Sequence, residues 1–90
     1  MVQILHKRAA QPATDESHIT EVRWYEPESG NINVATTATM VEWLRDKKGR
    51  AYVCNGLVVA DVEAVEGATP YIRVKPGPGV TVSLLNLPDF

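Results

Sequence analysis

The stretch from Thr39 to Gly56, T-M-V-E-W-L-R-D-K-K-G-R-A-Y-V-C-N-G, predicts one short helix followed by the first strand of a hairpin. Thr39 with Glu42 three residues later is a capping box, which predicts that the helix begins at Met40. The apolar positions at helical spacing form one stripe: Met40, Val41, Trp43 and Leu44. A helix of about nine residues is too short to persist alone in water, so another element must cover this stripe.

The end of the predicted helix carries two cations and a glycine. Lys47 and Lys48 lie in the last turn, where positive charge complements the negative end of the helix dipole. Gly49 follows, and glycine favours the left-handed conformation that ends many helices. We therefore predict a helix over about residues 40–48, packed on one face of a sheet.

Asn55-Gly56 is the strongest turn signal in the chain, because both residues tolerate the positive φ of a two-residue type I′ hairpin. Such a turn pairs residue 54 with 57 and residue 51 with 60, which fixes the side chains that share a face. One face then carries small apolar residues: Ala51, Val53, Val58, Ala60, Val62 and Ala64. Near the turn the other face is apolar as well: Tyr52, Cys54, Leu57 and Val59. The hairpin tip therefore needs a cover on both sides.

Two segments before the helix have the period-two pattern of strands. In 18–25, Val22 and Trp24 alternate with polar residues, which predicts the first core strand. In 31–37, Ile32 and Val34 are two residues apart, which indicates a short extended run. The turn-forming sequence E-P-E-S-G-N joins the two segments.

Strand patterns continue after the hairpin. Ile72 and Val74 alternate with polar residues in 71–75, and 80–84 alternates again after a loop that contains two prolines. The tail L-L-N-L-P-D-F is apolar enough that we expect it to dock on the domain. The fold class predicted for residues 18–90 is a single α+β domain, with a mostly antiparallel sheet of four or five strands in the order β-α-β-β-β(-β).

Residues 1–17 have small and polar residues around Pro12 and only a weak alternation in V-Q-I-L-H. We interpret them as a flexible N-terminal arm outside the domain. The alternative is a strand that adds to a sheet edge, for instance across a homodimer.

Composition is that of an ordinary soluble domain. The chain has 90 residues, 44% hydrophobic and 22% charged, and its net charge of −2 gives no general attraction to nucleic acid or anionic membranes. A single cysteine, Cys54, excludes an internal disulfide and a four-thiolate zinc site, which fits a reducing compartment. No segment approaches the roughly 18 apolar residues of a membrane span. We expect a cytoplasmic protein without a membrane association.

The candidate chemical groups form no convincing catalytic set. The chain has two imidazoles, His6 and His18, and one thiol, Cys54. The spacing does not exclude a Cys–His nucleophilic site, but such a site would need one of these histidines beside the hairpin tip together with an orienting third group. We therefore predict no catalytic residue, no metal site and no cofactor, and expect that the protein is not an enzyme. An enzyme that uses Cys54 stays the third alternative.

One basic cluster and the apolar hairpin tip form the candidate interaction surface: Arg45, Lys47, Lys48, Arg50, Tyr52, Leu57 and Val59. Because apolar surface exceeds what a small core needs, we expect a protein–protein interaction module that binds a cellular or host protein or a second copy of itself. The alternative is a nucleic-acid accessory protein that uses the basic cluster.

Several motifs together resemble one protein family: H-I-T-E-V-R-W, M-V-E-W-L, A-Y-V-C-N-G-L-V-V, P-Y-I-R-V and S-L-L-N-L-P. In this order over residues 18–90 they are similar to the family called domain of unknown function 3892, small proteins of bacteria and phages. The resemblance implies a small bacterial or phage protein of unknown function. It implies no catalytic residue, cofactor or partner.

Overall fold

The computed structural model describes residues 1–55, 58–77, 80 and 82–90. In chain order the elements are β1 (Val2–Ala9), the 3-10 helix η1 (Glu16–His18), β2 (Ile19–Glu26), β3 (Asn31–Thr36), α1 (Thr37–Asp46), β4 (Ala51–Asn55), β5 (Val58–Val65), β6 (Tyr71–Val74) and the 3-10 helix η2 (Leu84–Asn86). The predicted single α+β domain is confirmed in this coarse form, with one α-helix among the described residues.

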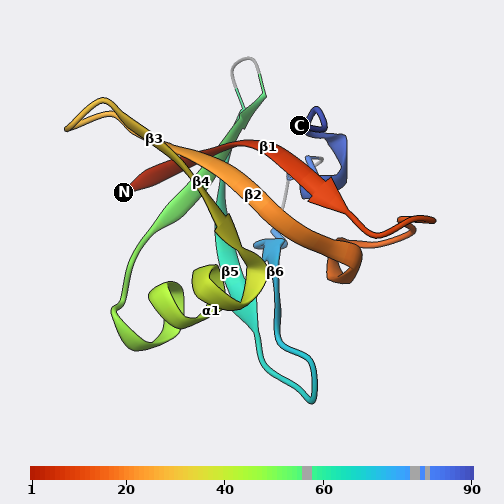
Figure 1. The fold of residues 1–90 in the computed structure, drawn as a ribbon. Coiled ribbons are helices and arrows are strands. Elements are labelled where there is room, and N and C mark those ends of the chain that lie inside the picture. The colour runs from red at the N-terminus through yellow and green to blue at the C-terminus, as the bar shows by residue number, and fades with distance from the viewer. Residues whose placement is uncertain (56–57, 78–79, 81) are drawn as a thin grey trace.

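The six strands form one mixed sheet in the order β3-β2-β1-β4-β5-β6 (Figure 1). β1 and β4 run parallel, and every other pairing of described strands is antiparallel. The predicted strand number and order are therefore wrong, because three strands precede the helix rather than one. The prediction of a mostly antiparallel sheet holds.

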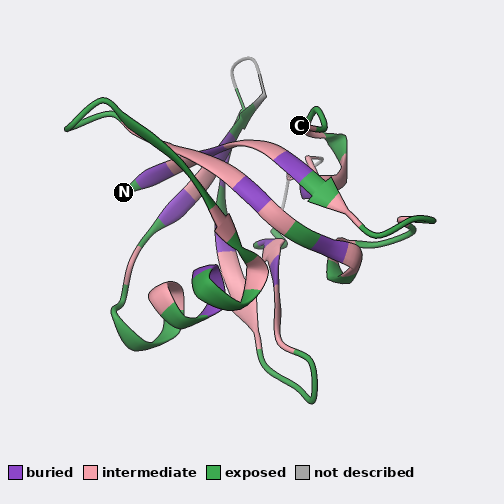
Figure 2. Cartoon of the chain, viewed as in Figure 1, coloured by how far each residue is buried: buried purple, intermediate pink, exposed green. Residues whose placement is uncertain are grey.

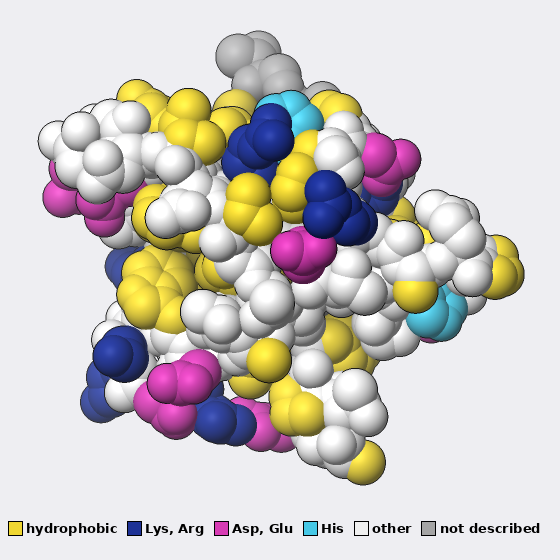
Figure 3. Space-filling model, in the orientation of Figure 1, with side chains coloured by type: hydrophobic (Ala, Val, Ile, Leu, Met, Phe, Trp, Pro, Cys, Tyr) yellow, Lys and Arg dark blue, Asp and Glu magenta, His cyan; other side chains and the backbone are white. Residues whose placement is uncertain are grey.

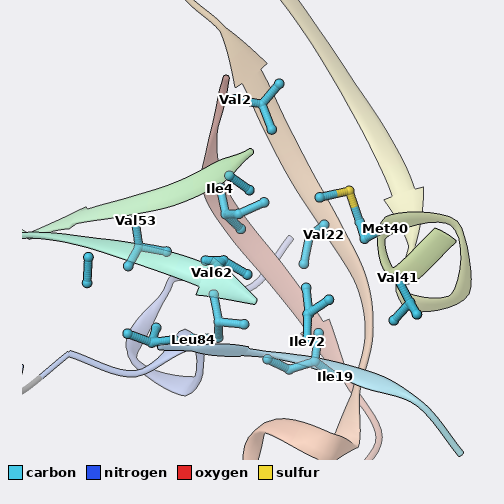
Figure 4. Packing of buried hydrophobic residues seen from close by; sticks show 13 residues of the cluster. Val2, Ile4, Ile19, Val22, Met40, Val41, Val53, Val62, Ile72 and Leu84 are labelled. Carbon is cyan, nitrogen blue, oxygen red and sulfur yellow. The ribbon is translucent and has the colours of Figure 1, made fainter. Parts of the chain in front are cut away.

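The parallel junction is short, and this lets the sheet fold over on itself. The register joins Val2 to Ala51 and Gln3 to Tyr52, after which β1 and β4 separate. Figure 1 shows β1, β2 and β3 crossing over β4, β5 and β6, with α1 at one open side. Figure 4 shows side chains from both halves, α1 and η2 converging in between, and Figure 2 shows β3 and the turns exposed outside them. The core consists of Val2, Ile4, Ile19, Val22, Met40, Val41, Ala51, Val53, Ala60, Val62, Ile72, Val74 and Leu84.

The interpretation of residues 1–17 as a flexible arm fails for Val2–Ala9, which form β1 in the interior of the sheet. A bulge hides the strand pattern: the register advances from Ile4 to His6 while β2 advances by one residue. The extra residue turns Lys7 rather than His6 toward the core, beside Val22. The sequence of β1 therefore shows no continuous alternation of apolar and polar residues.

Helix α1 begins earlier than the capping box predicts. Thr36 is the N-cap, and its Oγ accepts a hydrogen bond from the N–H of Thr39 at 3.2 Å. The predicted range 40–48 is corrected to Thr37–Asp46. Thr36 and Thr39 offer similar N-caps. Because β3 pairs with β2 up to Thr36, the helix begins after Thr36 rather than after Thr39.

The left-handed residue after α1 is Lys48, with φ of 52°, so the prediction of this conformation for Gly49 is wrong. Gly49 instead meets a packing requirement. An added Cβ would overlap the indole ring of Trp43, and the Gly49 N–H donates to the Trp43 carbonyl at 3.0 Å.

The β4–β5 hairpin forms with a different register. Asn55 pairs with Val58 and Ala51 with Val62, which is two residues from the predicted pairing. The same side chains still share a face, because a shift of two preserves the alternation. Hydrophobic pattern alone cannot separate these two registers. Residues 56 and 57, which include the predicted turn glycine and Leu57, lie outside the described residues.

The C-terminal segment docks as predicted, but not through a strand over 80–84. Leu84 opens η2 and is fully buried, and residue 81 lies outside the described residues. Farther on, the Lys7 N–H donates to the Pro88 carbonyl at 2.9 Å, and the Phe90 N–H donates to the Lys7 carbonyl at 3.2 Å. The tail thus pairs with the part of β1 that lies beyond its junction with β4.

Candidate functional site

The cationic residues of the predicted interaction surface lie at the end of α1 and in the loop after it. Nε of Arg45 is 2.8 Å from Oδ1 of Asp46, and its Nη1 is 3.4 Å from Oε2 of Glu66. The hydrogen bond to Asp46 raises the pKa of Arg45 and lowers the pKa of the Asp46 carboxyl below 3.8. Arg45 therefore stays charged, and its guanidinium is paired with two carboxylates. The other cations of the cluster are exposed: Lys47, Lys48 and Arg50.

The apolar residues of that surface lie toward the other end of β4. Val59 pairs with Cys54 near the hairpin tip and is 62% exposed, whereas Tyr52 is half-buried opposite Asp61. The ends of β4 are roughly 13 Å apart in an extended strand of this length. Figure 1 shows the end of α1 and the C-terminal end of β4 on opposite sides of the molecule. The structure therefore does not bring the predicted residues together in one patch.

The histidines and the cysteine lie on different elements. His6 pairs with Arg23 across β1 and β2, and its buried Nδ1 has no hydrogen-bond partner among the described residues. Nδ1 of His18 accepts from the Thr14 N–H at 3.0 Å in the turn before β2, while Cys54 is exposed in β4. Within the described ranges, no group of three or more His, Cys, Asp and Glu side chains could hold a metal ion.

An apolar pocket of about 190 Å³ lies between α1 and the inner faces of β2 and β3. Trp24 from β2 and Trp43 from α1 form part of its wall, and both residues are half-buried. The described lining residues are Val2, Trp24, Glu26, Ala35, Thr39, Met40 and Trp43. The volume is below the roughly 300–1,000 Å³ of sites for drug-sized ligands, so the pocket suits a single side chain.

The pocket is positioned by packing at both of its walls. Trp24 lies opposite Ile4 in the β1–β2 register, on the face that leads into the core. Trp43 rests on Gly49, whose missing side chain leaves room for the indole. Figure 3 shows hydrophobic side chains reaching the surface where β3 and α1 meet, with charged side chains over α1.

β3 is an edge strand next to this pocket. It pairs with β2 on one side, and its Ala35 lines the pocket. On the opposite face Ile32 is 59% exposed and Val34 is 41% exposed. The Val34 N–H donates to Oδ1 of the neighbouring Asn33 at 2.8 Å. An exposed edge strand with apolar side chains is a template for pairing with another strand.

Sequence reasoning missed this site because it assigned Trp24 and Trp43 to the core alone. The two residues are far apart in the sequence and meet through the packing of α1 on β2 and β3. The available signal was indirect: Ile32 and Val34 alternate in a segment whose remaining residues are small or polar, which is typical of a strand without a cover on one face.

These features define a small α+β domain with a mixed, folded-over sheet and a pocket beside one sheet edge. The chain matches no family model, no curated protein and no solved structure. The resemblance to domain of unknown function 3892 therefore stays a prediction. In the described part of the chain, none of the helices is long and apolar enough to cross a membrane.

Proposed function

We propose that this protein is a non-enzymatic protein-interaction module that pairs a segment of its partner with the free edge of β3. The single observation that supports this most is the edge itself, with Ile32 and Val34 exposed on a strand that has one neighbour among the described strands. Exposed apolar residues on an unprotected edge promote association unless a partner covers them. We place the protein in the cytoplasm, on the argument from its single cysteine.

Strand addition would use both faces of β3. The backbone of the added strand supplies hydrogen bonds, and its alternate side chains point to opposite sides of the sheet. On one side they would cover Ile32 and Val34, and on the other they would lie toward Ala35 and the pocket. The edge thus provides affinity and the pocket provides selectivity.

The chemistry of the pocket supports binding rather than catalysis. Glu26 is the sole ionisable side chain among its described lining residues, and its Oε1 accepts from Oγ of Ser29 at 2.6 Å. Catalysis by acid–base or nucleophilic routes needs a second positioned group. The described lining residues supply no imidazole, thiol or second carboxylate.

The alternative is the nucleic-acid accessory protein. It would use Lys47, Lys48 and Arg50, which are exposed on one short segment. Its electrostatic support is weakened at Arg45 by Asp46 and Glu66. Binding of this kind depends steeply on salt.

The test compares a β3 variant and a hairpin variant in sedimentation equilibrium and in affinity capture from native cells. The double variant Ile32→Lys, Val34→Lys places cations on the edge, which blocks strand pairing. We expect it to lose self-association or the captured partner, with at least a tenfold weaker interaction. Val59→Lys is the matched control, because Val59 is 62% exposed on the β4–β5 hairpin, close to the 59% of Ile32.

Each outcome decides between surfaces. If Val59→Lys abolishes the interaction and the β3 variant does not, the hairpin is the docking surface and the present assignment is wrong. If the charge-reversed variant Lys48→Glu, Arg50→Glu loses salt-sensitive binding to DNA or RNA, the accessory function replaces it.

A further inference from the structure

We propose that the pocket between α1 and β2–β3 binds a methylated ammonium group at the end of a lysine-length side chain. The inference rests on the proposed function in one respect, which is that the side chain belongs to a protein partner docked along β3. The pocket combines two indoles, a carboxylate and few hydrogen-bonding groups, and this combination selects a weakly hydrated cation.

The aromatic wall of the pocket favours a cationic ligand. Trp24 and Trp43 enter the pocket from different elements, one from the sheet and one from the helix. Indole has the strongest quadrupole of the aromatic side chains, and its face attracts ammonium groups within about 6 Å of the ring centroid. Met40 and Val2 are buried at the same pocket and exclude water from that side.

The negative charge of Glu26 in the pocket wall also favours a cation. Among the described residues no cation forms an ion pair with the Glu26 carboxylate, and the one hydrogen bond that this carboxylate accepts from them comes from the Ser29 hydroxyl. A neutral apolar side chain in the pocket would shield this carboxylate from water without replacing the lost interactions. A cationic side chain compensates the same desolvation with an opposite charge.

Hydrogen-bonding capacity selects among the cations. An arginine guanidinium carries five N–H donors and an unmodified lysine ammonium carries three, whereas a trimethylated ammonium carries none. The described lining residues contain two polar side chains, Glu26 and Thr39. N–H donors buried in the pocket without acceptors would reduce the binding free energy. Each methyl group added to the lysine ammonium replaces one donor and therefore lowers this penalty. We expect affinity to fall in the order trimethyl-lysine, lysine, arginine.

The test uses small probes and the protein's own fluorescence. Trp24 and Trp43 are the only two tryptophans in the chain, and both line the pocket. The probes are N-acetyl-trimethyllysine methylamide, its lysine and arginine counterparts, and the neutral isostere in which a tert-butyl group replaces the trimethylammonium. Titration is followed by tryptophan emission and by the indole N–H signals in NMR.

The expected result is binding of the trimethyllysine probe at least tenfold tighter than binding of the neutral isostere. Glu26→Gln should weaken the charged probe by about fivefold or more and leave the isostere unchanged, because the amide keeps the shape and removes the charge. Glu28→Gln is the matched control, since Glu28 is exposed in the turn that follows β2 and is not among the residues that line the pocket. Thermal melts of both variants check that each is folded.

Two results overturn the inference: equal affinity for the charged probe and the isostere, or no response of either indole at millimolar probe. The edge variant Ile32→Lys, Val34→Lys separates this failure from failure of the proposed function. The probes do not pair with a strand, so the edge variant should bind them normally. If the probes fail while the edge variant still disrupts association, β3 docking stands and the methylammonium site does not.

Discussion

The indole of Trp43 occupies the space that a side chain on Gly49 would need. This contact joins the wall of the pocket to the loop between α1 and β4. Trp43 lines the pocket, and Gly49 lies in that loop. Gly49 therefore influences the position of the Trp43 ring in the pocket wall, although Gly49 is not among the lining residues. The hydrogen bond from its N–H to the Trp43 carbonyl fixes the same contact through the backbone.

Gly49→Ala should displace the Trp43 ring and destabilise the domain. Overpacking of this kind costs about 1–3 kcal/mol of unfolding free energy. Urea denaturation measures this loss, and the emission spectrum should change in the folded state. Gly67→Ala is the control, since an added Cβ there meets no atom within 4 Å. Equal stability of the two variants would contradict the packing role of Gly49.

Glu16 connects three distant parts of the chain. Its Oε2 accepts from the N–H of Val74 and from the N–H of Leu84, each at 3.0 Å. Glu16→Ala leaves both amides without this acceptor, and we expect a loss of about 1–3 kcal/mol. Glu16→Gln keeps one acceptor oxygen and should lose less. Chemical denaturation ranks the variants, and hydrogen exchange at the Val74 and Leu84 amides should accelerate in Glu16→Ala.

The Lys7–Asp89 ion pair ties the tail to β1, with Nζ 2.5 Å from Oδ1. The Lys7 side chain is 10% exposed and that of Asp89 is 70% exposed, so the cation lies largely inside the protein. Asp89→Asn should cost about 1–3 kcal/mol, because the ammonium of the largely buried Lys7 side chain loses the carboxylate that it contacts. Adding Lys7→Met should recover part of this loss.

The exposed pair Arg8–Glu21 offers the control for that experiment. Surface pairs contribute roughly 0–1 kcal/mol, so Glu21→Gln should have a smaller effect on thermal stability. A larger loss for Glu21→Gln than for Asp89→Asn would show that burial of Lys7 does not determine the strength of its contact.

Asp15 should make the stability of the η1 turn depend on acidity. Hydrogen bonds from the Ser17 hydroxyl and from the Ser17 N–H lower the pKa of the Asp15 carboxyl below 3.8. Its contribution is therefore complete above the unfolded pKa of 3.8 and is lost as the pH falls through the lower folded value. Carbon-detected NMR should show this carboxyl titrating below 3.8. Asp15→Asn retains the cap and should remove this part of the acid sensitivity.

Local patterns in the sequence predicted the elements that have regular period. Val22 and Trp24 identified β2, Ile72 and Val74 identified β6, and the stripe from Met40 to Leu44 identified α1. β1 was missed because its bulge breaks the alternation at Leu5. The parallel pairing of β1 with β4 joins residues about 50 apart, and no local signal encodes such a contact.

The candidate site was predictable only in its parts. Ile32 and Val34 were visible as an alternating pair, yet their exposure depends on β3 having no second neighbour. The basic and apolar members of the predicted surface were adjacent in sequence, but an extended β4 separates them. The two ends of an extended strand lie apart, so side chains at its two ends do not share one surface. The chain reverses after β4, at the end that lies away from the basic residues.

The short junction between β1 and β4 also has a consequence for how the chain folds. β1, β2 and β3 form one meander within residues 2–36, and β4, β5 and β6 form another within residues 51–74. Most strand pairings therefore join strands that are consecutive in the sequence, whereas the β1–β4 pairing, the docking of the tail on β1 and the hydrogen bonds of Glu16 join distant segments. Contacts between distant segments raise the contact order and slow folding. Closure of the two meanders through Val2 and Ala51 is one of these long-range steps, and we expect substitutions at these positions to slow folding more than those within either hairpin.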